Sequence, residues 1–240
     1  MRQGGHGGPP LQALPMMREA IVVTIVENGV IPVILASSPE LALRAAETVH
    51  RGGIRAVEIT MTVPGAFHVM EKVAERLGDQ LLLGAGTVLD VETARAALAA
   101  GAEFLVSPTL KLGVIETAHR YSKPAIPGAL TPTEVLTAWE AGADFVKVYP
   151  AGSVGGPKYI RALKAPFPHI ELIPAGGVNL ETATDFSLAG AAALGVGADL
   201  VDPKALAAGK LDLIEDNARK FLDCVRQARS VNCRRAGASA

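Results

Sequence analysis

The chain has 240 residues, of which 49% are hydrophobic and 4% aromatic, and its 23 Lys and Arg nearly balance 24 Asp and Glu. This composition excludes a globally disordered chain, and the net charge of −1 provides no overall basic field for binding nucleic acid. Two cysteines cannot build a disulfide framework, and the five histidines lack the close spacing of a zinc motif, so we expect a cytoplasmic protein without a metal.

The ends of the chain differ in composition from its middle. Residues 1–18 are rich in Gly and Pro without the layout of a signal peptide, which predicts a flexible leader. The longest apolar region, residues 21–35, is interrupted by Glu27 and Pro32, so we expect no membrane span. We expect residues 19–229 to form one domain and residues 230–240 to be a frayed tail.

Short β-branched segments alternate with Ala- and Glu-rich segments of helical length. This alternation predicts a parallel sheet with right-handed crossovers. Eight such units in about 200 residues predict an α/β fold with a single (β/α)8 TIM barrel, and a doubly wound open sheet is the structural alternative. The predicted strands are Ile31–Leu35, Ala56–Met61, Leu81–Thr87, Phe104–Ser107, Ala125–Pro127, Phe145–Tyr149, Glu171–Pro174 and Ala193–Gly197.

The ends of the predicted helices follow a pattern as well. In four similar segments, a glycine ends the predicted helix shortly before the next strand begins. Glycine suits this place because it can adopt the left-handed backbone conformation found at helix ends. Capping side chains followed by Pro or an acidic residue mark three helix starts. The four glycines are Gly53, Gly101, Gly142 and Gly190, and the three caps are Ser38, Asp90 and Thr131.

Lys147 is the first candidate for chemistry. It lies in the strand Phe145–Tyr149, where alternation places Phe145, Lys147 and Tyr149 on one face. An ammonium group in a packed barrel interior loses hydration, so its pKa should fall, and such a lysine can form a Schiff base with a carbonyl substrate. The alternative is a lysine near a strand end that reaches solvent or pairs with an acid.

Glu58 is the second candidate. Alternation places Glu58 and Thr60 on one face of their strand, opposite Val57, Ile59 and Met61. A carboxylate in a central strand is costly unless it is paired or functional. Glu58 and Lys147 can therefore project into one interior as an acid–base group and an amine nucleophile, or as a structural ion pair.

Glycine-rich segments follow the last two predicted strands. Barrels often bind phosphate where these loops meet the start of a helix, because backbone N–H groups and the helix dipole attract anions. The alternative is two tight turns without a ligand. The glycines expected to bind phosphate are Gly176, Gly177, Gly195 and Gly197. Thr87, at the end of the third strand, can present a hydroxyl there or cap the next turn.

Seven motifs in unbroken order, between about residues 21 and 226, resemble the family of 2-keto-3-deoxy-6-phosphogluconate (KDPG) and 4-hydroxy-2-oxoglutarate (KHG) aldolases. The resemblance implies a (β/α)8 barrel, class I aldolase chemistry without a cofactor or metal, a small-molecule 2-keto acid substrate and a homotrimer, with no nucleic-acid or membrane partner. The motifs are VEITMTVPGA, LLLGAGTV, FLVSPTL, AIPGALTPTE, FVKVYPAGSVGGPKYIRALKAPFP, LIPAGGVNLE and ALGVGADLV.

The resemblance also assigns roles to individual residues. Lys147 matches the Schiff-base lysine, and Glu58 matches the general acid–base group. Thr87 and Pro108 match residues at the keto-acid end, and Tyr149 stands where the family has an aromatic residue beside the lysine. Thr60 and Thr62 are expected to bind substrate, and the four glycines named above match the phosphate end.

Three positions depart from common family members. Many members have Arg where this chain has Leu35, some have Arg at Thr62, and many have Ser at Ala198. Arginine binds anions through a bidentate fork that no other side chain provides, so its loss weakens anion recognition. Because of these departures, two alternative functions remain open. One is an aldolase for another 2-keto-3-deoxy acid, and the other is a barrel that binds metabolites without turnover. A metal-dependent sugar-phosphate epimerase is a further alternative, which lacks support because no matching Asp and His set occurs at the strand ends.

Overall fold

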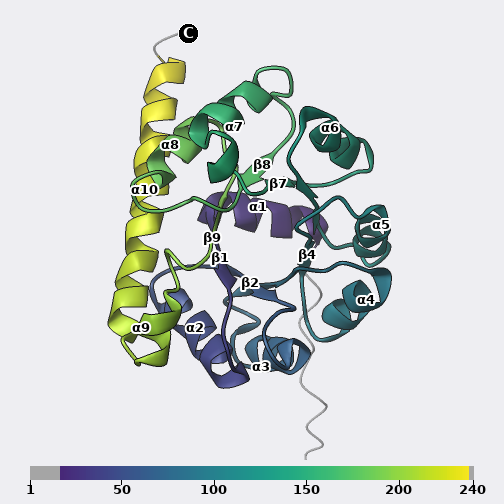
Figure 1. Ribbon diagram of the computed structural model, residues 1–240, viewed down its shortest axis with the longest axis vertical. Coiled ribbons are helices and arrows are strands. Elements are labelled where there is room, and N and C mark those ends of the chain that lie inside the picture. Colours follow the sequence, from purple (N-terminus) through teal and green to yellow (C-terminus); the bar gives the residue numbers. More distant parts are fainter. Residues whose placement is uncertain (1–16, 238–240) are drawn as a thin grey trace, which may run out of the picture.

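A computed structural model of the protein describes residues 17–237, in which short parallel strands alternate with helices (Figure 1). The strands are β1 (Val30–Ile34), β2 (Ala56–Thr60), β3 (Leu82–Gly86), β4 (Phe104–Val106), β5 (Ala125–Ile126), β6 (Gly128–Ala129), β7 (Val146–Val148), β8 (Leu172–Pro174) and β9 (Leu194–Val196). The α-helices are α1 (Arg18–Asn28), α2 (Pro39–Arg51), α3 (Ala66–Leu77), α4 (Val91–Ala99), α5 (Leu112–Arg120), α6 (Pro132–Glu140), α7 (Pro157–Lys164), α8 (Ala183–Leu188), α9 (Pro203–Ala207) and α10 (Leu211–Gly237).

The strands form two parallel sheets. One sheet has six strands in the order β5-β4-β3-β2-β1-β9, so the last strand of the chain pairs with the first, and the other has the order β6-β7-β8. The predicted strand Ala125–Pro127 corresponds to β5, which ends before Pro127 because proline has no N–H to donate to a strand ladder, and the short strand β6 that follows was not predicted. The other seven predicted strands are confirmed, with each end agreeing or differing by one residue.

Hydrophobic residues pack on both sides of the strands. On the outer side, Val57 and Ile59 belong to the cluster that also contains buried residues of the helices, which surround the strands in Figure 1. On the inner side, Phe104 and Phe145 pack against buried residues of α1, which lies across the middle of the view. The inner space near the beginnings of the strands is therefore filled, and open space remains near their ends.

The predicted helix boundaries match the structure closely. Ser38, Asp90 and Thr131 each accept a hydrogen bond from a backbone N–H in the first turn of a helix. The four repeated glycines all have a positive φ, between 89° and 100°. These local signals are confirmed because each depends only on the few residues around a helix end.

The two ends of the chain give different outcomes. The predicted leader falls mostly on residues 1–16, outside the described residues. The tail predicted to fray from residue 230 is instead the last part of α10, which continues to Gly237. Before that point, Arg229 donates hydrogen bonds to the carbonyls of Val26 and Glu27, which attaches α10 to the end of α1. None of the helices in residues 17–237 combines the length and apolar character that a bilayer crossing requires.

Candidate active site

A cavity of about 390 Å³ opens where the strands end, above the inner hydrophobic cluster. Residues of β1, β2, β7 and β9 and of the segments that follow β1, β3, β4, β7, β8 and β9 line it. Ten of the predicted site residues belong to its wall, namely Glu58, Thr60, Thr87, Pro108, Lys147, Tyr149, Gly176, Gly177, Gly195 and Gly197.

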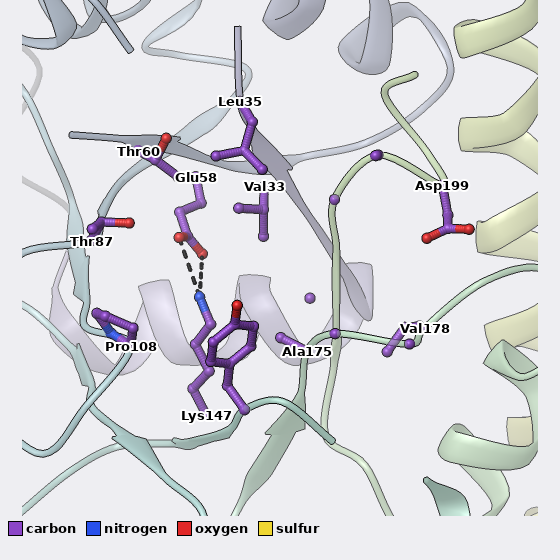
Figure 2. Close-up of a pocket in the computed structure, with 16 residues that line it drawn as sticks. Val33, Leu35, Glu58, Thr60, Thr87, Pro108, Lys147, Ala175, Val178 and Asp199 are labelled. Carbon is purple, nitrogen blue, oxygen red and sulfur yellow. Dashed lines mark hydrogen bonds and ion pairs between the residues drawn. The ribbon is translucent and has the colours of Figure 1, made fainter. Parts of the chain in front are cut away.

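Glu58 and Lys147 meet inside this cavity (Figure 2). The Lys147 Nζ atom lies 3.4 Å from Glu58 Oε1 and 3.5 Å from Oε2. Only 2% of Glu58 and 7% of Lys147 is exposed. Phe145 packs in the inner cluster below Lys147, while Val146 and Val148 pack outward, so the predicted alternation of β7 is confirmed. Two strands far apart in the chain thus place a carboxylate and an amine in one partly enclosed space.

The neighbouring strand β3 leaves room for this pair. A Cβ atom at Gly86 would lie 1.9 Å from Glu58 Oε1, so any larger residue would displace the carboxylate. Gly86 pairs in register with Thr60, two residues beyond Glu58 on the adjacent strand. The sequence analysis missed this role. The signal is the presence of two glycines in a strand whose other residues are apolar, but the role of each glycine depends on which strand lies beside it.

The three predicted threonines occupy different environments. Thr60 is buried, donates a hydrogen bond of 3.0 Å to the carbonyl of Ile34 and lies 2.7 Å from the hydroxyl of Thr62. Thr62 follows the end of β2, is exposed and is not part of the cavity wall, although its hydroxyl adjoins that of Thr60. Its predicted role in substrate binding stays a prediction. Thr87 lines the cavity with a φ of 58°, a left-handed conformation that is rare for threonine and often found at active sites.

Tyr149 and Pro108 complete the wall around Lys147. The Lys147 Nζ atom lies 5.9 Å from the centre of the Tyr149 ring, and 45% of Tyr149 is exposed. Figure 2 shows Pro108 beside the lysine side chain. An aromatic ring at this distance can interact favourably with a cationic nitrogen.

Two glycine-containing loops form the end of the cavity away from Thr87. Gly176 and Gly177 have φ values of 77° and 80°, and a Cβ atom at Gly177 would lie 2.8 Å from the Cα of Gly152. Glycine is therefore required at Gly177 by both backbone conformation and close packing. The segment after β9 adds Gly197, Ala198 and Asp199 to the wall.

Asp199 is the second site residue that the sequence analysis missed. It is exposed and lies on the far side of the glycine loops from the Lys147–Glu58 pair (Figure 2). The sequence signal for Asp199 is that it directly follows Ala198, one of the three positions that depart from common family members. Over residues 17–237, the only lysine or arginine in the cavity wall is Lys147. Within the same part of the chain, no group of three or more His, Cys, Asp or Glu side chains is arranged to hold a metal ion.

Comparison with known proteins gives consistent matches. The sequence model of the family described as KDPG and KHG aldolase matches residues 21–217. A 2-dehydro-3-deoxy-phosphogluconate aldolase of Treponema pallidum is 33% identical over 196 residues, which are 82% of this chain and 93% of that protein. A 2-dehydro-3-deoxy-6-phosphogalactonate aldolase of Escherichia coli strain K12 is 37% identical over 171 residues, which are 71% and 83% of the two chains.

A solved structure is similar over most of the fold. KDPG aldolase from Legionella pneumophila, with pyruvate captured as a covalent carbinolamine intermediate, gives a TM-score of 0.78 at 29% identity. The match covers 84% of this chain and 97% of that one.

Proposed function

Because the chain belongs to the KDPG and KHG aldolase family, we propose that it cleaves 2-keto-4-hydroxy acids to pyruvate and an aldehyde through a Schiff base on Lys147. The observation that carries this proposal is the amine of Lys147 in a cavity, 3.4 Å from the buried carboxylate of Glu58. KDPG would give pyruvate and glyceraldehyde 3-phosphate, and KHG would give pyruvate and glyoxylate. Another 2-keto-3-deoxy acid would react in the same way.

The first steps join the substrate to the protein. Glu58 lies near enough to accept a proton from Lys147, and catalytic hydrogen bonds are often long before a substrate is bound. The uncharged amine then attacks the C2 ketone to form a carbinolamine. Glu58 gives its proton to the departing hydroxyl of the carbinolamine and becomes a carboxylate again. Loss of water leaves an iminium, whose positive charge lies close to the ring of Tyr149 and to Glu58.

The next step breaks the carbon–carbon bond. Glu58, directly or through a water molecule, removes the proton of the C4 hydroxyl, and the electron pair of the C3–C4 bond moves toward the iminium. The aldehyde leaves, and an enamine remains on Lys147. Protonation of C3 and addition of water release pyruvate and restore the free amine. The iminium thus serves as the electron sink for the cleavage.

The remaining residues of the wall hold the substrate. Thr87 and Pro108 lie beside the Lys147–Glu58 pair, which suits contact with the keto-acid end of the substrate. The buried Thr60 supports this end through its hydrogen bond to the Ile34 carbonyl. Gly176, Gly177, Gly195 and Gly197 line the region that the aldehyde part of the substrate would reach, with phosphate as their predicted ligand.

We also propose that the two sheets form one closed eight-stranded (β/α)8 barrel. Pro127 alone separates β5 from β6, and its carbonyl accepts a hydrogen bond of 2.8 Å from Lys147 N. Isolated bridges join Leu172 to Ala191 and Ala175 to Gly195, across the gap between β8 and β9. By resemblance, the assembly is a homotrimer in the cytoplasm, and exposed apolar side chains such as Leu112 and Trp139 supply surface that association could cover.

Borohydride trapping tests the nucleophile. Incubation with pyruvate and borohydride should reduce the imine and add the pyruvate carbons to one peptide, the one that contains Lys147. Lys147→Arg should trap nothing and release no pyruvate from either substrate, because a guanidinium stays protonated and forms no imine. Lys158→Arg, an exposed lysine outside the cavity wall, is the matched control and should trap like the natural protein. Trapping on another lysine, or trapping that survives in Lys147→Arg, would refute the assignment.

A further inference from the structure

The three tyrosines of the chain differ in how their hydroxyl groups are bonded. Tyr121 accepts a hydrogen bond of 3.1 Å from Arg95 Nε, and Tyr159 donates one to the carbonyl of Leu130. Over residues 17–237, the hydroxyl of Tyr149 has no such partner within the protein, and Tyr149 is the one tyrosine in the cavity wall. A phenolic hydroxyl can donate and accept hydrogen bonds, so this group is available to a ligand in the cavity.

Two neighbours define where the Tyr149 ring lies along the cavity. The centre of the ring lies 5.9 Å from Lys147 Nζ. A Cβ atom at Gly176 would lie 3.3 Å from Tyr149 Cε2, which is bonded to the carbon that bears the hydroxyl. The ring therefore lies near the reacting amine, and its hydroxyl-bearing end lies near the first of the two glycine loops.

The carbon chain of the substrate is long enough to reach this hydroxyl. In the Schiff base, C2 is bonded to Lys147 Nζ, and C5 follows after three carbon–carbon bonds of about 1.5 Å each, so C5 lies within about 6 Å of Nζ. The Tyr149 ring lies at a similar distance from the same atom. The C6 phosphate of KDPG would lie farther along, toward Gly176 and Gly177. Because Glu58 acts on the C4 hydroxyl, the C5 hydroxyl is the next polar group that needs a partner.

We propose that Tyr149 is a specificity-determining residue whose phenolic hydroxyl donates a hydrogen bond to the C5 hydroxyl of the substrate. This inference rests on the proposed aldolase function and narrows its substrate class to 2-keto-3-deoxy sugar acids that carry a hydroxyl group on C5. The catalytic steps at Lys147 and Glu58 and the predicted phosphate end at the glycine loops are unchanged.

The test follows the reaction in the direction of synthesis, in which the enamine of pyruvate on Lys147 adds to an aldehyde. The C5 hydroxyl of the product is then the 2-hydroxyl of the aldehyde. Glyceraldehyde 3-phosphate is compared with 3-oxopropyl phosphate, which lacks only that hydroxyl, and pyruvate consumption gives kcat/KM for each. Because the two aldehydes also differ in intrinsic reactivity, the readout is the change in the ratio of their kcat/KM values between variants.

Tyr149→Phe keeps the ring and removes only the hydroxyl. It should lower the ratio by about fivefold, the effect of one hydrogen bond between uncharged groups, through a lower kcat/KM for glyceraldehyde 3-phosphate. A general loss of activity would lower both values and cancel in the ratio. Borohydride trapping of this variant with pyruvate, which has no C5, shows that its site is folded.

Tyr121→Phe is the matched control. Tyr121 is 44% exposed and Tyr149 is 45% exposed, but Tyr121 lies outside the cavity wall. Removing its hydroxyl should leave the ratio of the two kcat/KM values unchanged.

The outcomes distinguish this inference from the proposed function. An unchanged ratio in Tyr149→Phe would overturn the inference, and so would an equal loss with both aldehydes, which would place the role of the phenol at Lys147. Trapping of pyruvate on Lys147 of the natural protein would uphold the aldolase in either case. Absence of trapping, together with no pyruvate consumption with either aldehyde, would overturn the aldolase and the inference together.

Discussion

At the scale of single residues, the buried Lys147–Glu58 pair is explained better by a role in function than by a contribution to stability. Both side chains are nearly inaccessible to water, and removing two charges from water costs free energy that their attraction often only offsets. Gly86 makes the space for the carboxylate, since a side chain there would overlap Glu58. A pair that contributes little to stability, together with a glycine that accommodates it, is consistent with a pair used for proton transfer.

Replacing Glu58 by glutamine tests this assignment. Glu58→Gln keeps the size of the side chain and removes its ability to take a proton. General acid–base groups contribute about 10²- to 10⁴-fold in rate, so kcat should fall by that factor in a steady-state assay of pyruvate release. Lys147 should still be trapped with pyruvate and borohydride, though slowly. A kcat near that of the natural protein would show that another group, or solvent, moves the proton.

At the scale of elements, the start of α6 shows how local sequence supports the site. Thr131 Oγ1 accepts a hydrogen bond of 3.3 Å from Glu134 N, and Glu134 Oε2 accepts one of 2.8 Å from Thr131 N. This capping box begins two residues after β6, in which Gly128 pairs with Lys147 of β7. The backbone N–H groups of Thr131 and Leu130 lower the pKa of Glu134 below its ordinary value of 4.5.

The capping box predicts a pH-dependent contribution to stability. Thr131→Ala should lower the free energy of unfolding by about 1 kcal/mol, the usual effect of losing such a cap. The pKa of Glu134 is lower in the folded than in the unfolded protein, so its carboxylate stabilises the fold above the unfolded pKa, and this contribution is lost as pH falls through the folded pKa. In urea unfolding, Glu134→Gln should therefore be less stable than the natural protein at about pH 7, and the difference should shrink toward about pH 3.

A matched control lies at the other end of the same helix. Glu140 is exposed in the last turn of α6, where a negative charge faces the negative end of the helix dipole. Glu140→Gln should leave stability unchanged or raise it slightly at about pH 7. If both glutamine variants lost the same stability, the effect would come from net charge and not from the capping box.

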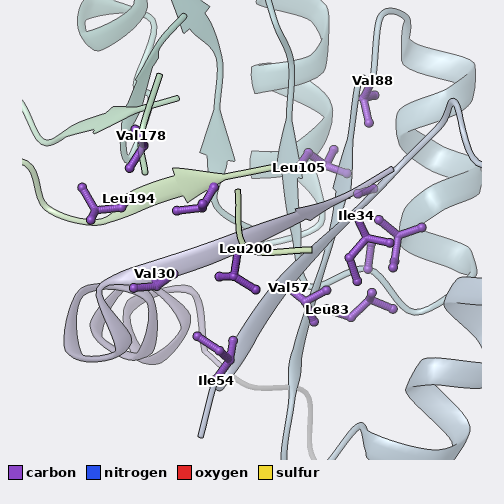
Figure 3. Packing of buried hydrophobic residues seen from close by; sticks show 14 of the residues in the cluster. Val30, Ile34, Ile54, Val57, Leu83, Val88, Leu105, Val178, Leu194 and Leu200 are labelled. Carbon is purple, nitrogen blue, oxygen red and sulfur yellow. The ribbon is translucent and has the colours of Figure 1, made fainter. Parts of the chain in front are cut away.

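At the scale of the whole molecule, the outer hydrophobic cluster joins the ends of the chain to its middle. Val30 of β1 and Leu194 of β9 belong to this cluster, which also includes Phe221 and Val225 of α10 (Figure 3 shows its part around β1 and β9). α10 packs along α2 and α8. The last helix thus covers the place where the first and last strands pair.

Two substitutions in α10 measure this support. Phe221 is 0% exposed, so Phe221→Ala leaves a cavity and should lower the free energy of unfolding by about 3–5 kcal/mol in urea denaturation. Leu213 lies in the same helix but is 55% exposed, and Leu213→Ala should change the free energy of unfolding by less than about 0.5 kcal/mol. Both variants should keep kcat at a temperature where they remain folded, since neither residue lines the cavity. A loss of kcat in folded Phe221→Ala would show that α10 shapes the site directly.

The sequence by itself determined the features that depend on near neighbours. The β-branched segments, the alternation that puts Glu58 and Lys147 on the inner faces of their strands and the capping residues at helix starts all agree with the structure. Each follows from a period of two residues along a strand or from side chains within one turn of a helix. The resemblance to the aldolase family rested on the same local motifs.

Only the tertiary structure decided which of these residues meet. Glu58 and Lys147 are 89 positions apart, and their contact exists because β2 and β7 face each other across the cavity. The same arrangement excludes Thr62 from the wall, adds Asp199 to it and requires glycine at Gly86. No period along the chain encodes these relations, because the curvature of the sheets and the path of each loop set the distances between strands that are distant in sequence.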